Sequence, residues 1–507
     1  MAFNYAEDVA PEIWQRCWIF VERDCLPALT LTCRLFNDIC KPMLFEQLEF
    51  SLPRPYSRGF QYSTPKANSI EMRFENVSSN DKFNKLVRSL TFVAHSKARS
   101  RPLDTPPELS EEAMLRIALE AYETLLMTIS SSISRFCLLQ QVSVGPVPLG
   151  PQFMRNLRLL GHLNQVHIDS TAGVISPQGT APLRVGEFSY EELEVYHTFN
   201  PPTIMIPPLI VVTEHLQRMS LSGAQANTIL TSFIRHGSIF RKLRYLSFQV
   251  NPSHISSFFD FLLICPILET LRIINYRELA DILSTDLPAV SAAAAPRLAN
   301  YLGPDSIAVA LAPGRPISKT VLVNTVSHVS GLTAADIASL GCSSTPIVVL
   351  SLGLRFMNRA AFHNLSIYLP QLQKFTVHIY EVNSQGYMLE DAIPYLDLLS
   401  ELEMNTVPLP RSIQILGLGQ QRRFEPYTYR GIRPTHTLIP EPFPIEQQEM
   451  FLVTLSSLYP ELREASLGMR RVDWRKHTSQ EGEKGIWAQA EVPDMFPLYD
   501  KSGFATL

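Results

Sequence analysis

One short pattern recurs along most of this chain and constrains its fold more than any other feature. In each copy a leucine or isoleucine is followed three residues later by an apolar residue, with a second apolar residue two positions further on. Alternation of this kind is typical of a short β-strand that buries one face. The copies begin at Leu139, Leu163, Leu216, Leu243, Leu268, Ile347, Leu372 and Leu462.

The spacing of these copies indicates how the strands are connected. Four neighbouring pairs of copies lie 24 to 27 residues apart, and wider gaps separate the other copies. A helical pattern such as residues 255–263 stands between copies. Strand and helix units that repeat every 20 to 29 residues or so are typical of leucine-rich repeats. A doubly wound α/β domain also alternates strands with helices, but repetition of one pattern favours the solenoid. We therefore predict an α/β fold with an irregular leucine-rich repeat solenoid and a parallel sheet over residues 86–470.

Composition excludes several classes of protein and partner. Apolar residues make up 46% of the 507 residues and charged residues 18%, which is typical of a folded chain and not of a disordered one. The 44 basic and 48 acidic side chains give a net charge of -4, so neither nucleic acid nor a membrane surface is predicted as a partner. With no export signal and no apolar run of about 20 residues, we expect a cytoplasmic or nuclear protein.

Residues 1–50 carry the pattern of three short amphipathic helices. Pro11 and Glu12 suit the first turn of a helix, and Asp24 is predicted to cap a second one. Phe36 begins a third helix, which Pro42 is expected to end. These helices have more apolar surface than three short segments can bury among themselves.

Two segments of this region resemble an F-box: residues 10–14, with the sequence APEIW, and residues 24–36, with the sequence DCLPALTLTCRLF. Together with the repeats, they make the chain similar to F-box and leucine-rich proteins of the divergent fungal type. The resemblance implies a three-helix F-box-like module that docks on the adaptor subunit of a cullin-RING ubiquitin ligase. Carried over by position, the adaptor-binding residues would be Pro11, Ile13, Trp14, Cys17, Leu26, Leu29, Leu31 and Phe36.

Two other regions complete the predicted organisation. Residues 51–85 are rich in Pro, Ser, Arg and Asn, so we expect a linker or an irregular first wrap. In residues 471–507, two tryptophan-containing segments, 472–475 and 485–488, flank a polar turn and predict a hairpin cap followed by a tail. A tryptophan binding platform is the alternative interpretation of the same segments.

No pattern of catalytic or cofactor-binding residues is present. The sequence has no phosphate-binding loop, no His-Glu-x-x-His pair and no Gly-x-Ser-x-Gly elbow. Gly417 and Gly419 are interpreted as part of a strand turn. Cys17, Cys25, Cys33 and Cys40 recur at intervals of seven or eight residues, which suits small residues on helix faces better than a zinc site. We predict no catalytic residue, no cofactor and no metal.

The sequence therefore favours a non-enzymatic adaptor that docks on a cullin-RING ligase and captures an unidentified protein on its repeats. An alternative is a repeat scaffold for protein–protein interaction with no ligase link, whose N-terminal helices only cap the array. A hydrolase with a site assembled from distant residues is a third possibility.

Overall fold

The chain forms two compact units in a computed structural model: unit 1, Met1–Leu243, and unit 2, Arg244–Leu507. The division falls inside the stretch that the sequence predicts as one solenoid. The structure describes residues 10–18, 20–53, 60, 63–94, 110–145, 151–169, 182–191, 211–223, 226–250, 252–274, 287–322, 332–355, 359–380, 393–421, 443–468, 472–477 and 486–489.

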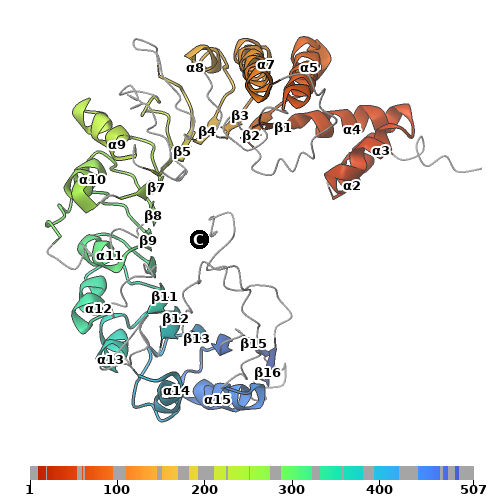
Figure 1. Ribbon diagram of the computed structural model, residues 1–507. Coiled ribbons are helices and arrows are strands. Elements are labelled where there is room, and N and C mark those ends of the chain that lie inside the picture. Colours follow the sequence, from red (N-terminus) through yellow and green to blue (C-terminus); the bar gives the residue numbers. More distant parts are fainter. Residues whose placement is uncertain are drawn as a thin grey trace, which may run out of the picture. The chain divides into compact units, whose positions relative to one another are not determined.

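Unit 1 begins with helices and continues as strands that alternate with further helices (Figure 1). Each strand pairs in parallel with the next strand along the chain. The strands are β1 Gln47–Leu52, β2 Ser89–Ala94, β3 Gln141–Val144, β4 Gln165–Asp169, β5 Glu187–Glu191 and β6 Arg218–Leu221. The α-helices are α2 Pro11–Trp18, α3 Leu26–Thr30, α4 Arg34–Glu46, α5 Thr64–Ser79, α6 Asp81–Asn84, α7 Glu111–Ser132, α8 Pro151–Leu157 and α9 Ala226–Arg235, with 3-10 turns at Arg23–Cys25 and Ile133–Arg135.

Unit 2 has the same alternation, with its helices along one side of the strands (Figure 1). From β7 to β14 every strand pairs in parallel with the next, whereas β15 and β16 are antiparallel. The strands are β7 Tyr245–Gln249, β8 Thr270–Ile274, β9 Asn300–Gly303, β10 Lys319–Leu322, β11 Val349–Arg355, β12 Lys374–Tyr380, β13 Ile415–Gln421, β14 Glu464–Gly468, β15 Val472–His477 and β16 Ile486–Gln489. The helices are α10 Ile255–Leu263, α11 Asp305–Leu311, α12 Ala334–Gly341, α13 Arg359–Tyr368, α14 Tyr395–Glu403 and α15 Ile445–Leu458, with a 3-10 turn at Pro252–His254.

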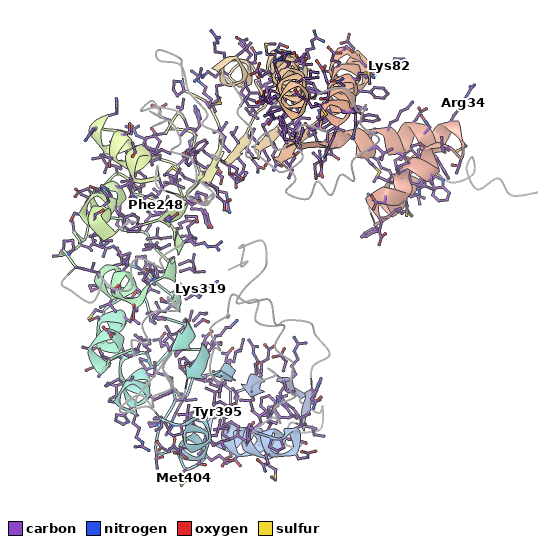
Figure 2. All side chains as sticks on the ribbon, viewed as in Figure 1. Arg34, Lys82, Phe248, Lys319, Tyr395 and Met404 are labelled. Atoms are coloured by element: carbon purple, nitrogen blue, oxygen red, sulfur yellow. The ribbon has the colours of Figure 1, made fainter. Side chains whose placement is uncertain are left out.

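The recurring sequence pattern forms strands that are aligned in register. Leu246 of β7 faces Leu271 of β8, and Leu350 of β11 faces Phe375 of β12. All four side chains are fully buried. The helices cover this side of the sheet, as where Phe248 stacks on Phe258 of α10 with ring centroids 5.4 Å apart (Figure 2). The predicted α/β class and the largely parallel pairing are therefore confirmed.

Some strands have a weaker pattern than the copies found in the sequence. β9 and β10 occupy the long gap between the copies at Leu268 and Ile347, with Tyr301 and Thr320 at buried positions where aliphatic residues were expected. The Tyr301 hydroxyl donates a hydrogen bond to the Pro304 carbonyl at 2.7 Å, so its polar atom is satisfied inside the core. A pattern based on apolar residues misses strands that have Tyr or Thr at buried positions.

The strand turn expected at Gly417 is wrong, because Gly417 and Gly419 lie inside β13. A Cβ atom at position 417 would come within 2.7 Å of the Thr376 Cγ2 atom on the neighbouring strand. Glycine at this position therefore permits close approach of a neighbouring side chain and does not mark a turn.

In residues 51–85, predicted as a linker or an irregular first wrap, most of the described residues instead have regular structure. β1 extends to Leu52 and pairs with β2, while α5 and α6 occupy most of the remaining described residues. Pro65 stands in the first turn of α5, where proline starts a helix and does not interrupt it. Ala67, Phe74 and Val77 are buried on one face of that helix. β1 also crosses residue 50, so the helical module ends at Glu46.

Arg315 is a fully buried cation that fixes an irregular segment of unit 2. Its Nε atom donates to the Ala294 carbonyl at 2.7 Å and its Nη2 atom to the Ser291 carbonyl at 2.6 Å. Its Nη1 atom donates to the carbonyls of Leu311, at the end of α11, and Pro313. Burial lowers the pKa of the guanidinium, and the carbonyl dipoles offset the cost of burying its charge.

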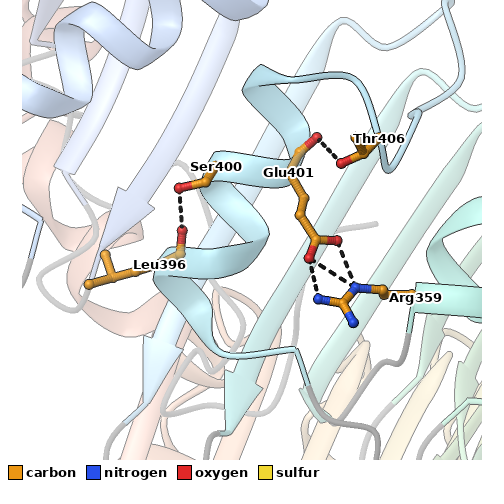
Figure 3. Close-up of polar contacts among 5 residues, drawn as sticks. All are labelled: Arg359, Leu396, Ser400, Glu401 and Thr406. Carbon is orange, nitrogen blue, oxygen red and sulfur yellow. Dashed lines mark hydrogen bonds and ion pairs between the residues drawn. The ribbon is translucent and has the colours of Figure 1, made fainter.

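The outer helices of unit 2 are linked by an ion pair on the surface. Arg359 at the start of α13 binds the carboxylate of Glu401 on α14 through two of its nitrogen atoms (Figure 3). The hydrogen bonds to Glu401 raise the pKa of Arg359. Because Arg359 is exposed, solvent screens this pair, and it orients the two helices more than it stabilises them.

The last described strands of unit 2 are the antiparallel pair β15 and β16, where the sequence predicts a hairpin, and the predicted tail lies outside the described residues. Trp474 and Trp487 are 2% and 3% exposed and pack toward α15. Their indole nitrogens donate to Gln448 Oε1 at 3.0 Å and to Ser456 Oγ at 2.9 Å. Buried and hydrogen-bonded indoles do not form an exposed binding platform, so the capping interpretation fits these side chains better.

The substitution Leu271→Asp is expected to lower the free energy of unfolding of unit 2 by several kcal/mol, because it places an unpaired carboxylate in the core. Thr270→Asp is the matched control, since its side chain is half-buried on the opposite side of the sheet. Thermal unfolding of the two variants measures the difference. Equal midpoints would contradict the register described for β8.

Arg315→Met should destabilise unit 2 by at least about 2 kcal/mol, because it leaves buried carbonyls without donors. Arg315→Lys keeps the charge but cannot reach all four carbonyls, so an intermediate loss is expected. Chemical denaturation of the purified proteins provides the measurement. A methionine variant as stable as the parent would show that the carbonyl contacts contribute no net stability.

Candidate docking surface

The first three helices of unit 1 share a small aromatic core. Trp18, Leu26 and Cys40 are buried, and Trp14, Leu29 and Phe36 are among the partly buried side chains packed against them. The Phe36 ring meets Trp14 edge-on at 5.1 Å and Trp18 at 4.4 Å between centroids. Edge-to-face contacts of this kind add to the free energy gained by burial. Phe36 therefore fixes α4 against α2.

The ends of these helices differ from the sequence prediction. Asp24 lies within the short 3-10 turn before α3, and Cys25 occupies the cap position without a side-chain hydrogen bond. The expectation that Asp24 caps the second helix is wrong. Cys33 caps α4 instead, because its sulfur accepts a hydrogen bond from the Phe36 backbone at 3.4 Å.

Pro42 lies inside α4 and does not end it, which also corrects the sequence prediction. A proline at this position removes the backbone N–H that would bond to the carbonyl of Asp38, four residues earlier. Asp38 is at an exposed position, where water can replace the missing donor. The helix continues because Cys40, Met43 and Leu44 still pack on the module core.

The eight residues predicted to bind an adaptor divide into two groups. Four of them build the module itself, since Leu26 is 3% exposed and the others pack around the core: Trp14, Leu26, Leu29 and Phe36. The remaining four are exposed to solvent: Pro11, Ile13, Cys17 and Leu31. Ile13 is 54% exposed and Leu31 87% exposed. Exposed apolar side chains of this size are candidates for a contact with another protein.

Phe20 is a further candidate that the predicted set omits. It follows α2 in a turn, where its backbone N–H bonds to the Cys17 carbonyl at 3.2 Å, and its side chain is 88% exposed. The signal was present in the sequence, because Ile13, Cys17 and Phe20 follow helical spacing. Together Pro11, Ile13, Cys17, Phe20 and Leu31 are here named the exposed apolar set.

Helix α2 has a different character on its other flank. There a cleft separates α2 from the end of α4 and the start of β1, with an apolar floor and a rim of charged and amide side chains. It is lined by Glu12, Gln15, Arg16, Trp18, Val21, Leu26, Met43, Glu46 and Gln47. Glu12, Gln15 and Arg16 of α2 thus line this cleft, whereas Ile13 and Cys17 of the same helix do not.

The cysteines of the module lie in different surroundings. Cys17 and Cys25 are exposed, Cys33 is half-buried, and burial raises the pKa of the Cys40 thiol. Within the described residues, no three or more His, Cys, Asp or Glu side chains are grouped so that they could hold a metal ion. The described residues of the module therefore offer a partner apolar contact area.

Leu26→Ala and Leu31→Ala should separate the core of the module from its surface. The first change removes a buried side chain and is expected to cost about 2 to 5 kcal/mol, whereas the second should stay within about 0.5 kcal/mol of the parent. Hydrogen exchange of the α2 and α4 amides reports the local stability. Equal protection in both variants would contradict this assignment of Leu26 and Leu31.

Comparison with known proteins gives no further guide to this surface. No family model matches the chain, and no curated protein matches it. None of the helices in the described parts of the chain has both the length and the apolar character needed to span a bilayer. A proposal for function therefore rests on the residues of the module and of the sheets.

Proposed function

We propose that this chain is a substrate-recognition adaptor. Its F-box-like module, α2 to α4, docks on the adaptor subunit of a cullin-RING ubiquitin ligase, and its strand–helix units form a leucine-rich repeat solenoid that captures a protein. The chain contributes geometry, and the ligase partners contribute the chemistry of ubiquitin transfer. The observation that carries the proposal is the exposed apolar set on a module whose own core is already filled.

The exposure of Ile13, Phe20 and Leu31 favours docking over simple capping. A helical cap on a repeat array needs one apolar face toward the array and a polar face toward water. Here large apolar side chains remain in water while Trp18 and Leu26 already form a core. Such a surface gains free energy when a partner covers it.

The alternative is a repeat scaffold with no ligase link. It is favoured by the direct connection of the module to the sheet, since β1 begins at the residue after α4 and the Arg88 backbone donates to the Glu46 carbonyl at 2.8 Å. A cap would need this continuity, and a docking module would not. Binding to the ligase adaptor distinguishes the two functions.

The double substitution Ile13→Glu with Leu31→Glu should weaken binding of the purified ligase adaptor at least a hundredfold, which is about 2.8 kcal/mol. Both changes place a carboxylate where the complex would have to desolvate it, and neither residue belongs to the module core. Gln15→Glu is the control, because it adds a carboxylate to the polar rim of the cleft beside α2. Calorimetry with the full-length chain provides the measurement.

A truncated chain that begins at Glu46 complements this test. It keeps the Glu46 carbonyl and the whole of β1, so the remainder should stay folded while adaptor binding is lost. Undiminished binding by the variant Ile13→Glu with Leu31→Glu would rule out the exposed apolar set as the docking surface. Failure of the intact, folded chain to bind any adaptor would leave the scaffold function.

A further inference from the structure

Four of the five strands from β8 to β12 carry basic residues, and none of the five carries an acidic one. β8 to β12 include Arg272, Lys319 and Lys374, and none of the residues in these strands is Asp or Glu. The whole chain has a net charge of -4, so this local excess of positive charge runs against the overall composition. It therefore calls for a separate explanation.

Strand register places these cations on the side of the sheet away from the helices. Lys319 faces Val349, which in turn faces Lys374, so the two lysines lie two strand spacings apart, roughly 9 to 10 Å. Lys319, Val349 and Lys374 are all half-buried. In contrast, Thr320, which follows Lys319, and Leu350, which follows Val349, are buried toward the helices. Lys319 accordingly lies on the helix-free side of its strand (Figure 2).

Apolar side chains lie among the cations on the same side. Arg272 faces Leu302 of β9, and Leu302 faces Val321 of β10. Both aliphatic residues are half-buried. The helix-free side of β8 to β12 thus mixes cations with aliphatic side chains, and the six residues of this mixture are here named the cationic face: Arg272, Leu302, Lys319, Val321, Val349 and Lys374.

The electrostatic surroundings of these cations favour an external anion. Burial lowers the pKa of Lys374, the carboxylate of Glu464 on β14 raises it, and the charge of Lys319 lowers it. An external carboxylate near Lys319 would reduce the repulsion between the two lysines, and Arg272 adds a third positive charge on the same side of the sheet.

We propose that the cationic face binds an acidic protein segment in which carboxylates flank an apolar side chain. Lys319, Lys374 and Arg272 would pair with the carboxylates, and Leu302, Val321 and Val349 would cover the apolar side chain. Nucleic acid is a poorer match, because the cationic face has no aromatic side chain on which a base could stack. The segment is the captured protein only if the proposed adaptor function is correct.

The test uses the full-length chain and two fluorescent peptides, one of alternating Glu and Leu and one of alternating Lys and Leu. The acidic peptide should bind, and binding should weaken as salt increases. Lys319→Glu with Lys374→Glu should raise its Kd at least about tenfold, about 1.4 kcal/mol. Arg241→Glu with Lys242→Glu reverses two exposed charges outside the strands and should leave the Kd within about twofold.

A second measurement shows whether the charge-reversed variant is folded. Lys319→Glu with Lys374→Glu should bind the Lys and Leu peptide more tightly than the parent does, which an unfolded chain would not do selectively. Equal affinity of the parent for both peptides would overturn the proposal. Tighter binding of a single-stranded oligonucleotide, or of vesicles containing phosphatidylserine, than of the acidic peptide would overturn it as well.

The two proposals fail in different experiments. The variant Ile13→Glu with Leu31→Glu should bind the acidic peptide as the parent does, because neither residue belongs to the cationic face. A parent chain that binds the acidic peptide but no ligase adaptor would refute the adaptor function and support the cationic face. A chain that binds the adaptor but not the acidic peptide would support the adaptor function and refute the proposal for the cationic face.

Discussion

Parallel pairing of neighbouring strands, from β1 to β6 in unit 1 and from β7 to β14 in unit 2, is the constraint on which this structure depends. In unit 2 it aligns alternate side chains into rows across the strands, so that Leu246 and Leu271 continue through Tyr301 on the buried side. Helices must then cover that row, because its apolar area is stable only out of water. The opposite rows are left without helices, and any surface for a partner is set by the same register.

The N-terminal module, α2 to α4, must also bury apolar side chains, but it has far fewer residues with which to do so. Three short helices provide too little area to bury every apolar side chain that they carry. The aromatic contacts of Phe36 with Trp14 and Trp18 fill the centre, and Ile13 and Leu31 remain in water. The choice of which side chains enter the core also decides which ones a partner can touch.

Net charge conceals how the charges are distributed. The strands of unit 1 carry Glu49, Asp169, Glu187 and Glu191 against a single strand arginine, Arg218, which pairs with Glu187. β8 to β12 of unit 2 carry cations without carboxylates. A composition near neutrality therefore argues against a long polyanion as partner, but not against local recognition of acidic side chains.

Local sequence determined the α/β class, the positions of the regular strands and the buried role of residues such as Leu271 and Phe375, because apolar periodicity reports the burial of one face directly. Tertiary structure decided the rest. Tyr301, Thr320 and Gly417 belong to strands because parallel pairing with the adjacent strands places them there, and Pro42 stays within a helix because Cys40, Met43 and Leu44 still pack on the module core. The division of the eight predicted adaptor-binding residues into core and surface was likewise beyond sequence, since Leu26 and Leu31 are both apolar and only packing against α2 and α4 distinguishes them. The cationic face is a product of register for the same reason: Lys319 and Lys374 are 55 residues apart in the chain and become neighbours across one strand.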